Sequence, residues 1–199
     1  MFLSKIELDL KSPSARQSLR NANDMHRNLQ ALFSSSREES GLLYRLYKAG
    51  SGMFVYMLSE AEPSAVTGNG ITVVGSGNVD GYIDSFCDGQ VYSFNLLAVP
   101  CKKVASEGSK NSRRRNLTNR EEREQWLESK GKAGGFEILQ LQMRNGESLF
   151  IRKKDNHFRL NSVMFSGILK ITDGETFKMT YKKGVGPEKA YGMGMLFLR

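Results

Sequence analysis

Histidine and cysteine are scarce in this chain, and their scarcity limits the chemistry that it can perform. Two histidines, His26 and His157, and two cysteines, Cys87 and Cys101, occur among 199 residues. There is no Cys-x-x-Cys pair and no histidine beside a cysteine, so neither a zinc site nor a disulfide framework is predicted. The carboxylates show none of the His-Glu-x-x-His or Asp-x-Asp spacing of metal-dependent hydrolases. We therefore expect no metal ion and no other cofactor.

Long apolar segments are also missing. No stretch approaches the roughly 20 apolar residues that a membrane-spanning helix requires, and the mean hydropathy is -0.43. Residues 1–10 alternate charged and apolar side chains, unlike the uninterrupted apolar core of a signal peptide. We expect a cytoplasmic protein that has no membrane partner.

Positive charge, by contrast, is in excess. Lysine and arginine number 29 against 21 acidic residues, which gives a net charge of +8 and a pI near 9.5. This balance indicates a polyanionic partner, and nucleic acid is the commonest one. The alternative is a basic surface that serves solubility alone.

The first half of the chain has the pattern of a βαββαβ unit. Apolar side chains alternate along residues 2–10, as in a half-buried strand. Residues 25–33 place apolar side chains on one face of a helix that Asn23 or Asp24 can cap. The remaining elements expected in this half are strands at 42–48, 53–58 and 90–99 and a short helix within 63–70.

A polar and basic segment separates the two halves. It contains Arg113, Arg114 and Arg115 and cannot bury enough apolar surface to fold alone. We interpret residues 102–118 as a linker or as a mobile arm that contacts RNA. This interpretation places an N-terminal domain at 1–101 and a C-terminal domain at 119–199.

The second half again mixes helices and strands. Thr118 and Glu121 have the spacing of a capping box, which opens a charged helix that Gly131 can close. Thr172 and Glu175 form a second capping box, before a helix that Gly184 can end. Strands are expected at 136–143, 149–153, 158–171 with a break near Gly167, and 193–198. Both halves therefore predict an α+β fold, although their sequences show no obvious repeat.

His26 is the candidate catalytic residue because histidine titrates near neutrality and can donate or accept a proton. RNA supplies its own nucleophile, the ribose 2′-hydroxyl, whose attack on the adjacent phosphorus leaves a cyclic phosphate and a free 5′-hydroxyl. No metal is then required. Arg27 or Lys189 would stabilise the charge that builds on the phosphate. The alternative is a surface histidine on a first helical turn, and we interpret His157 as a turn residue.

Residues 184–194 form a glycine-rich segment that can bring backbone close to a phosphate or base. The repeated glycines permit that approach, and Lys189 supplies charge. A glycine-rich turn into an edge strand explains the pattern equally well. The glycines of this segment are Gly184, Gly186, Gly192 and Gly194, and Lys182 and Lys183 precede it as further candidate RNA-binding residues. A predicted hairpin tip carries four more candidate cations, which are Arg152, Lys153, Lys154 and Arg159. A solvated tip is the alternative.

Several segments together resemble the CasE family, the CRISPR repeat-processing endoribonucleases of type I-E systems. They are the N-terminal residues 1–5, the Met25-His26-Arg27 helix start, residues 165–169 and the glycine pattern from Gly184 to Leu196, with similar elements at 96–100, 126–127 and 135–136. The resemblance thus spans nearly the whole chain. It implies two tandem ferredoxin-like (RRM-like) domains with antiparallel sheets, and His26 falls at the catalytic histidine of the family.

The resemblance also implies a substrate and partners. The expected substrate is a CRISPR repeat RNA stem-loop, cut at the 3′ base of the stem after a C-terminal hairpin docks in it. The product guide RNA would stay bound within the type I-E surveillance complex, and the free protein would be a monomer. Asn23 stands where some members have a tyrosine, so a tyrosine partner in acid/base chemistry is not carried over. A non-cleaving RNA-binding subunit of the same complex remains the alternative, and a general DNA-binding protein lacks a groove-reading signature.

Overall fold

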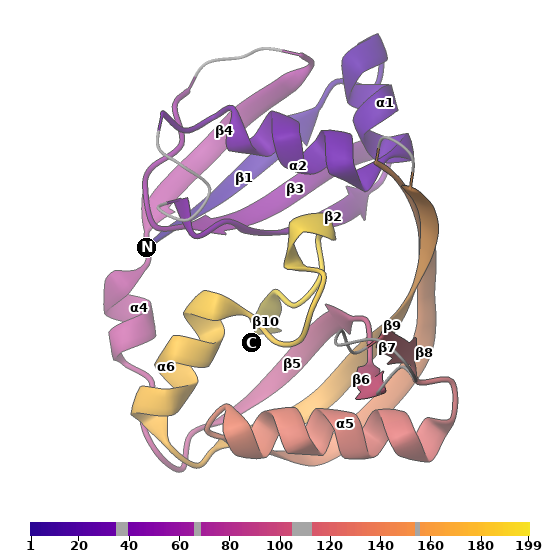
Figure 1. The fold of residues 1–199 in the computed structure, drawn as a ribbon. Coiled ribbons are helices and arrows are strands. Elements are labelled where there is room, and N and C mark those ends of the chain that lie inside the picture. The colour runs from indigo at the N-terminus through magenta and orange to yellow at the C-terminus, as the bar shows by residue number, and fades with distance from the viewer. Residues whose placement is uncertain (35–39, 66–68, 105–112, 154–155) are drawn as a thin grey trace.

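The computed structural model describes residues 1–34, 40–65, 69–104, 113–153 and 156–199. It contains two four-stranded antiparallel sheets, one in each half of the molecule, with helices packed against them (Figure 1). The predicted α+β class with antiparallel sheets is confirmed. No helix of the described residues is long and apolar enough to cross a membrane.

The first sheet has the strand order β2-β3-β1-β4, which is that of a ferredoxin-like unit. Its strands are β1 (Phe2–Leu8), β2 (Leu43–Ala49), β3 (Gly52–Ser59) and β4 (Ile71–Asn78), and the helices α1 (Pro13–Arg20) and α2 (Ala22–Gln30) join β1 to β2. Met25 and Leu29 of α2 are fully buried with Ile6, Val55 and Met57 of the sheet. The predicted apolar face of this helix therefore covers the first sheet.

Three elements of the first half differ from the prediction. Ser12 precedes a helix with proline in its first turn, α1, in a polar stretch for which we expected no helix or strand. Residues 63–65 and 69–70 are not helical, while 66–68 of the expected short helix lie outside the described residues. The sheet is completed by β4, whose Gly75 and Gly77 make it read as a turn in the sequence.

The second sheet has the order β10-β5-β9-β8 and the same ferredoxin-like arrangement. Its strands are β5 (Val91–Ala98), β8 (Phe136–Lys153), β9 (Asn156–Ile171) and β10 (Leu196–Leu198). The helices α5 (Arg120–Ala133) and α6 (Gly174–Lys183) carry buried residues of the same core, including Leu127 and Phe177 packed with Phe165 and Leu169. The expected pair of tandem ferredoxin-like units is thus present.

The expectation that residues 90–99 complete the first sheet is wrong. Strand β5 pairs with β9 and β10, so the chain passes from the first sheet to the second between Asn78 and Val91, by way of α4 (Asp80–Asp84). A division at residue 101 does not coincide with this change of sheet. Residues 102–118 lie between two elements of the second half, and their described ends form a two-stranded sheet of β6 (Cys101–Val104) and β7 (Arg113–Asn116). Residues 105–112 lie outside the described part.

Helix starts and strand limits also differ in detail. The residues that cap α2, α5 and α6 are Asn21, Asn119 and Asp173, each of which accepts a backbone N–H in the first turn. The expected capping boxes at Thr118 and Thr172 are therefore each one residue early. Helix α5 continues past Gly131 and ends at Ala133. Strand β8 is continuous, and one of its two register shifts, between Asn145 and Ser148, lies where we expected a gap. Strand β9 is not broken at Gly167.

Candidate functional site

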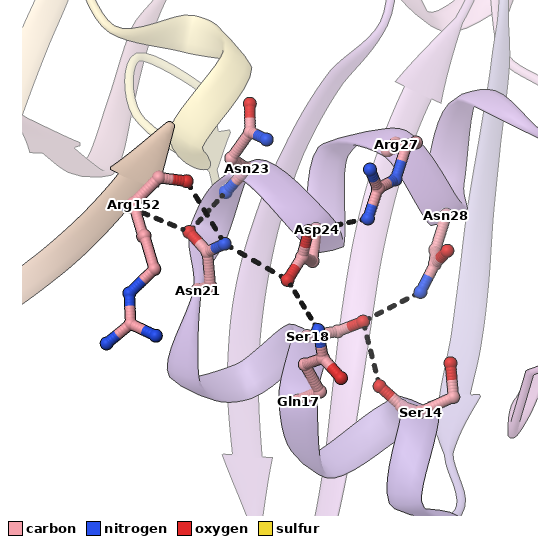
Figure 2. A network of polar contacts seen from close by, with 9 residues as sticks. All are labelled: Ser14, Gln17, Ser18, Asn21, Asn23, Asp24, Arg27, Asn28 and Arg152. Atoms are coloured by element: carbon pink, nitrogen blue, oxygen red, sulfur yellow. Dashed lines mark hydrogen bonds and ion pairs between the residues drawn. The ribbon is translucent and has the colours of Figure 1, made fainter. Parts of the chain in front are cut away.

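The N-terminus of α2 is joined to the end of β8 by the side chain of Asn21 (Figure 2). Asn21 Oδ1 accepts hydrogen bonds from the backbone N–H of Asn23 at 3.3 Å and of Arg152 at 3.1 Å. Asn21 Nδ2 donates to the Arg152 carbonyl oxygen at 3.3 Å. One amide thus caps the helix and holds the β8–β9 hairpin beside it.

Asp24 is the hub of this polar network. Its Oδ2 accepts from Gln17 Nε2 at 3.1 Å and from Asn21 Nδ2 at 3.0 Å, and its Oδ1 pairs with Arg27 Nη2 at 2.7 Å. The carboxylate is mostly buried and lies in the first turn of α2, where the helix dipole favours negative charge. These contacts fix the orientation of α2 against α1.

His26 lies between the buried Met25 and the exposed Arg27, and its side chain is half-buried. The Nδ1 atom is shielded from solvent. Of the two ring nitrogens, Nδ1 is therefore not the one that a ligand could reach from solvent. Because His26 is one turn from the fixed end of α2, the Asn21 and Asp24 contacts also limit its position.

The glycine-rich segment packs against the start of α2. Tyr44 Oη lies 3.4 Å from the carbonyl oxygen of Ala22 and donates at 3.1 Å to that of Ala190, in the 3-10 turn η1 (Lys189–Tyr191). Burial, with a smaller contribution from Tyr191, raises the pKa of Tyr44 far above its ordinary value, so its hydroxyl remains a donor. The second half of the molecule thereby reaches the helix that carries His26.

Backbone bonds close this segment on itself. The N–H of Val185 donates to the Gly194 carbonyl oxygen at 2.8 Å, and the N–H of Gly194 donates to that of Leu97 at 2.8 Å. Gly194 has φ +86°, and a Cβ there would lie 2.7 Å from the Val185 carbonyl oxygen. A glycine is therefore required at this position for two separate reasons.

A basic cleft of about 600 Å³ opens beside the Asn21 contact. Arg16 and Arg20 of α1 and Arg152 of β8 supply its cations, and Phe150 lines it as well. Sequence reasoning missed Arg16 and Arg20 because it missed α1. The signal was Ser12-Pro13, a helix start, with two arginines spaced i, i+4 behind it. The cleft can hold a polyanion between the two halves of the molecule.

The other predicted cations are dispersed. Arg27 is 71% exposed while it pairs with Asp24, and Arg159 is exposed on β9. Lys189 and Arg114 line a second hollow.

None of the remaining predicted cations is among the described residues that line the cleft or the hollow. Arg115 pairs with Glu122 at 2.9 Å. Lys182 is half-buried and Lys183 exposed at the end of α6, and the side chains of Arg113, Lys153 and Lys154 lie outside what the structure describes.

The residues brought together at this site suit acid/base chemistry on a polyanion. The cleft of arginines lies where α1, the start of α2 and β8 adjoin, and η1 of the glycine-rich segment packs on the same helix α2, which also carries the half-buried His26. Among the described residues there is no group of three or more histidine, cysteine or carboxylate side chains that could hold a metal ion. The geometry supplies proton transfer and positive charge from side chains alone.

Known proteins resemble this chain over its whole length. A family model described as CRISPR associated protein matches residues 1–199. The CRISPR-associated endoribonuclease Cse3 of Thermus thermophilus is 32% identical over 220 residues, covering 98% of each chain. A solved CRISPR endoribonuclease Cse3 bound to 19 nt RNA is 30% identical with a TM-score of 0.87, and both chains are covered in full. The Thermus thermophilus Cse3 bound to an RNA representing a pre-cleavage complex is 28% identical with a TM-score of 0.83, covering 100% of this chain and 98% of that one.

Proposed function

Because the chain belongs to the CasE (Cse3) family of CRISPR-associated proteins, we propose that it is an endoribonuclease that processes CRISPR precursor RNA. The proposed cut lies at the 3′ base of the repeat stem-loop. The curated relative is an endoribonuclease, and two solved relatives, both Cse3 proteins, are bound to RNA. The observation in this molecule that supports the proposal best is the placement of His26 on a helix whose N-terminus is tied to the β8–β9 hairpin through Asn21.

The reaction is an internal phosphoryl transfer that needs no external nucleophile. The 2′-oxygen at the cut site forms a bond to the adjacent phosphorus, and the bond from phosphorus to the 5′-oxygen breaks. One product ends in a 2′,3′-cyclic phosphate and the other begins with a 5′-hydroxyl. Two protons move: one leaves the 2′-hydroxyl and one reaches the 5′-oxygen. His26 Nε2 moves one of them, in a mechanism without a metal ion.

The remaining residues bind and orient the RNA. Arg27 projects into solvent from the same helical turn as His26, where it can stabilise the charge on the phosphorane. Arg16, Arg20 and Arg152 line the cleft that receives the RNA backbone. Arg159 and the rest of the β8–β9 hairpin meet the stem.

The proposal includes the fate of the product and the setting of the enzyme. After the cut, the protein stays bound to the guide RNA and joins the other subunits of the type I-E surveillance complex. Before it meets RNA it is a monomer in the cytoplasm. Sustained multiple turnover under excess RNA would contradict this retention.

The test is cleavage of the cognate repeat hairpin in EDTA by the wild-type protein and by His26→Ala. His157→Ala removes the other histidine and serves as the matched control. Because His157 lies in β9, and not in a turn as we expected, it belongs to the hairpin that meets the stem. Cleavage is therefore measured at saturating protein, so that only the chemical step is compared. A third arm uses an RNA with a single 2′-deoxyribose at the cut site. We expect the wild type and His157→Ala to cut in EDTA, while His26→Ala and the deoxy RNA give binding without product.

Each other outcome points elsewhere. Cleavage that requires added metal, or that survives loss of His26, would overturn the assigned chemistry. A wild-type protein that binds the hairpin tightly and never cuts it would instead be the non-cleaving RNA-binding subunit.

A further inference from the structure

A second hollow, of about 600 Å³, lies between the β6–β7 pair, α5 and the beginning of the glycine-rich segment. Four cations from four different elements line it: Lys103 of β6, Arg114 of β7, Lys130 of α5 and Lys189 of η1. Among its described lining residues there is no carboxylate. It therefore concentrates positive charge, of which the local fold neutralises only that of Arg114 among the described ion pairs.

One acidic residue lies at the edge of the hollow, and it is already engaged. Glu188 pairs with Arg114 at 3.0 Å and is largely buried. Lys103, Lys130 and Lys189 have no carboxylate among the described ion pairs. Burial, followed by the charges of Lys130 and Lys183, lowers the pKa of Lys189 below its ordinary value. Lys130 and Lys189 therefore repel each other, and an anion placed between them would relieve that repulsion.

The hollow is separate from the site that holds His26, yet it is connected to it through η1. Lys189 lines the hollow, while the next residue, Ala190, accepts the Tyr44 hydroxyl beside α2. Tyr191 packs edge-to-face on Phe158 of the β8–β9 hairpin, with ring centroids 6.2 Å apart. No residue of α2 is among the described residues that line the hollow. A strand bound near α2 would have to pass around η1 to enter it.

The lining favours phosphates over bases. Trp126 is the aromatic residue of the hollow, but it is only 9% exposed and is stacked on Phe165 at an interplanar angle of 22°. A base therefore has little free ring surface to stack on, whereas the cations are available to a sugar–phosphate backbone. Recognition here would be independent of sequence.

We propose that this hollow binds the phosphates of a single-stranded RNA segment that flanks the repeat stem. The inference rests on the proposed function and adds a second contact surface to it. A volume of about 600 Å³ lies within the range of sites that enclose small ligands, so it accommodates a short stretch of backbone. The flank would be held by charge alone, while the stem is held by the cleft of Arg16, Arg20 and Arg152.

The test compares three uncleavable RNAs, each with a 2′-deoxyribose at the cut site: the bare hairpin, the hairpin with a 5′ flank and the hairpin with a 3′ flank. Equilibrium affinity is measured over a series of salt concentrations for the wild type, Lys103→Gln/Lys130→Gln, and the control Lys132→Gln. Lys132 is exposed on the same helix as Lys130 and does not line the hollow. The substituted lysines are all solvent-exposed, so folding is expected to survive.

We expect one flank to tighten binding to the wild type and to Lys132→Gln, and the double variant to lose that gain. For the flanked RNA, the slope of the logarithm of the binding constant against the logarithm of the salt concentration should be shallower by about 1.4 in the double variant, because two phosphate contacts to a single strand are lost. Affinity for the bare hairpin should be unchanged, which also shows that the variant is folded. The proposal would be overturned if the double variant lost as much affinity for the bare hairpin as for the flanked RNA. It would also be overturned if the double variant lost no more affinity than Lys132→Gln, or if neither flank tightened binding to the wild type. A wild type that bound no hairpin would overturn the proposed function with it.

Discussion

Asn21 and Arg152 are 131 residues apart in the chain and hydrogen bond to each other twice, at 3.1 and 3.3 Å. The same Asn21 side chain caps α2 and donates to Asp24. The position of His26 therefore depends on a contact between the two halves of the molecule. Variants that break this contact should affect catalysis more than their effect on stability predicts.

Asn21→Ala should lower both stability and cleavage. Loss of the cap alone costs about 1 kcal/mol of unfolding free energy, and loss of the Arg152 bonds adds to it. The control is Asn119→Ala, which removes the cap of α5, where Asn119 accepts from the Glu121 N–H at 2.8 Å. Urea denaturation should show a loss for both variants, whereas single-turnover cleavage should fall strongly only for Asn21→Ala. Equal cleavage rates in the two variants would show that the bridge to β8 has no part in the reaction.

Gly194→Ala should open the glycine-rich segment. The new Cβ meets the Val185 carbonyl oxygen, and the left-handed backbone itself costs about 1–2 kcal/mol. Gly50→Ala is the matched control, because Gly50 has φ +58° with nothing within 4 Å of an added Cβ. Thermal unfolding should reveal a larger loss for Gly194→Ala, accompanied by weaker RNA binding. If both variants lose the same stability, the close approach to Val185 is not a constraint.

Arg20→Gln and Arg152→Gln should each weaken binding of the bare hairpin without changing its sequence preference. Both side chains line the cleft beside Asn21, and each lost phosphate contact reduces the salt dependence of binding by about one. Lys170→Gln serves as control, because Lys170 pairs with Glu137 at the opposite end of β8 and β9. Affinity titrations at several salt concentrations distinguish these cases. Wild-type salt slopes in the arginine variants would place the RNA elsewhere.

Tyr181 should make the protein less stable in alkali. Burial raises the pKa of its phenol to about 12, against about 10 in the unfolded chain. Because the unfolded state releases the proton first, this contribution is complete below pH 10 and is lost as the pH rises to 12, by up to about 1.4 kcal/mol per pH unit. Tyr181→Phe has no phenolic proton to release at this position. Above pH 10 the unfolding free energy of the wild type should therefore fall relative to that of the variant. A constant difference from pH 8 to 11 would contradict the shift.

The sequence predicted best where periodicity and burial agree. The alternation along β1 and the apolar face at 25–33 reflect residues such as Ile6, Met25 and Leu29 that are fully buried. The β2–β3 hairpin also lies where two strand-like runs flank a glycine turn. In each case one face of the element packs on a core, so the spacing of the apolar residues shows which element forms.

Two strands, β4 and β5, could not be assigned to a sheet in this way. Strand β4 is mostly exposed and carries Gly75 and Gly77, so local propensity favours a turn, and only pairing with β1 makes it a strand. Strand β5 has a clear strand pattern, yet the pattern does not say which sheet it joins. That choice is made by long-range pairing with β9, which is invisible in a local window.

In the candidate site, too, the sequence predicted features that depend on a single residue but not those that depend on long-range contacts. His26 was found from its residue type and its family context, whereas its supports were not. The Asn21 side chain binds the backbone of Arg152, a contact that no sequence motif signals. Arg16 and Arg20 could have been predicted as cleft residues only if helix α1 had been recognised in the sequence. Lys189 was predicted to stabilise charge on the phosphate beside His26, and its side chain lines a hollow whose described lining contains no residue of α2.

The order of the elements along the chain has a consequence for synthesis. Strands β1 to β4 close the first sheet by Asn78, so the unit that carries His26 can fold early, as N-terminal domains do during translation. Its partner surfaces, Arg152 of the hairpin and Ala190 of η1, emerge much later, and β5 must wait for β10 to cover its free edge. A nascent chain would thus hold a folded His26 helix with no hairpin beside it. The surfaces that pack on this helix would reach it only after Ala190 of η1 has left the ribosome.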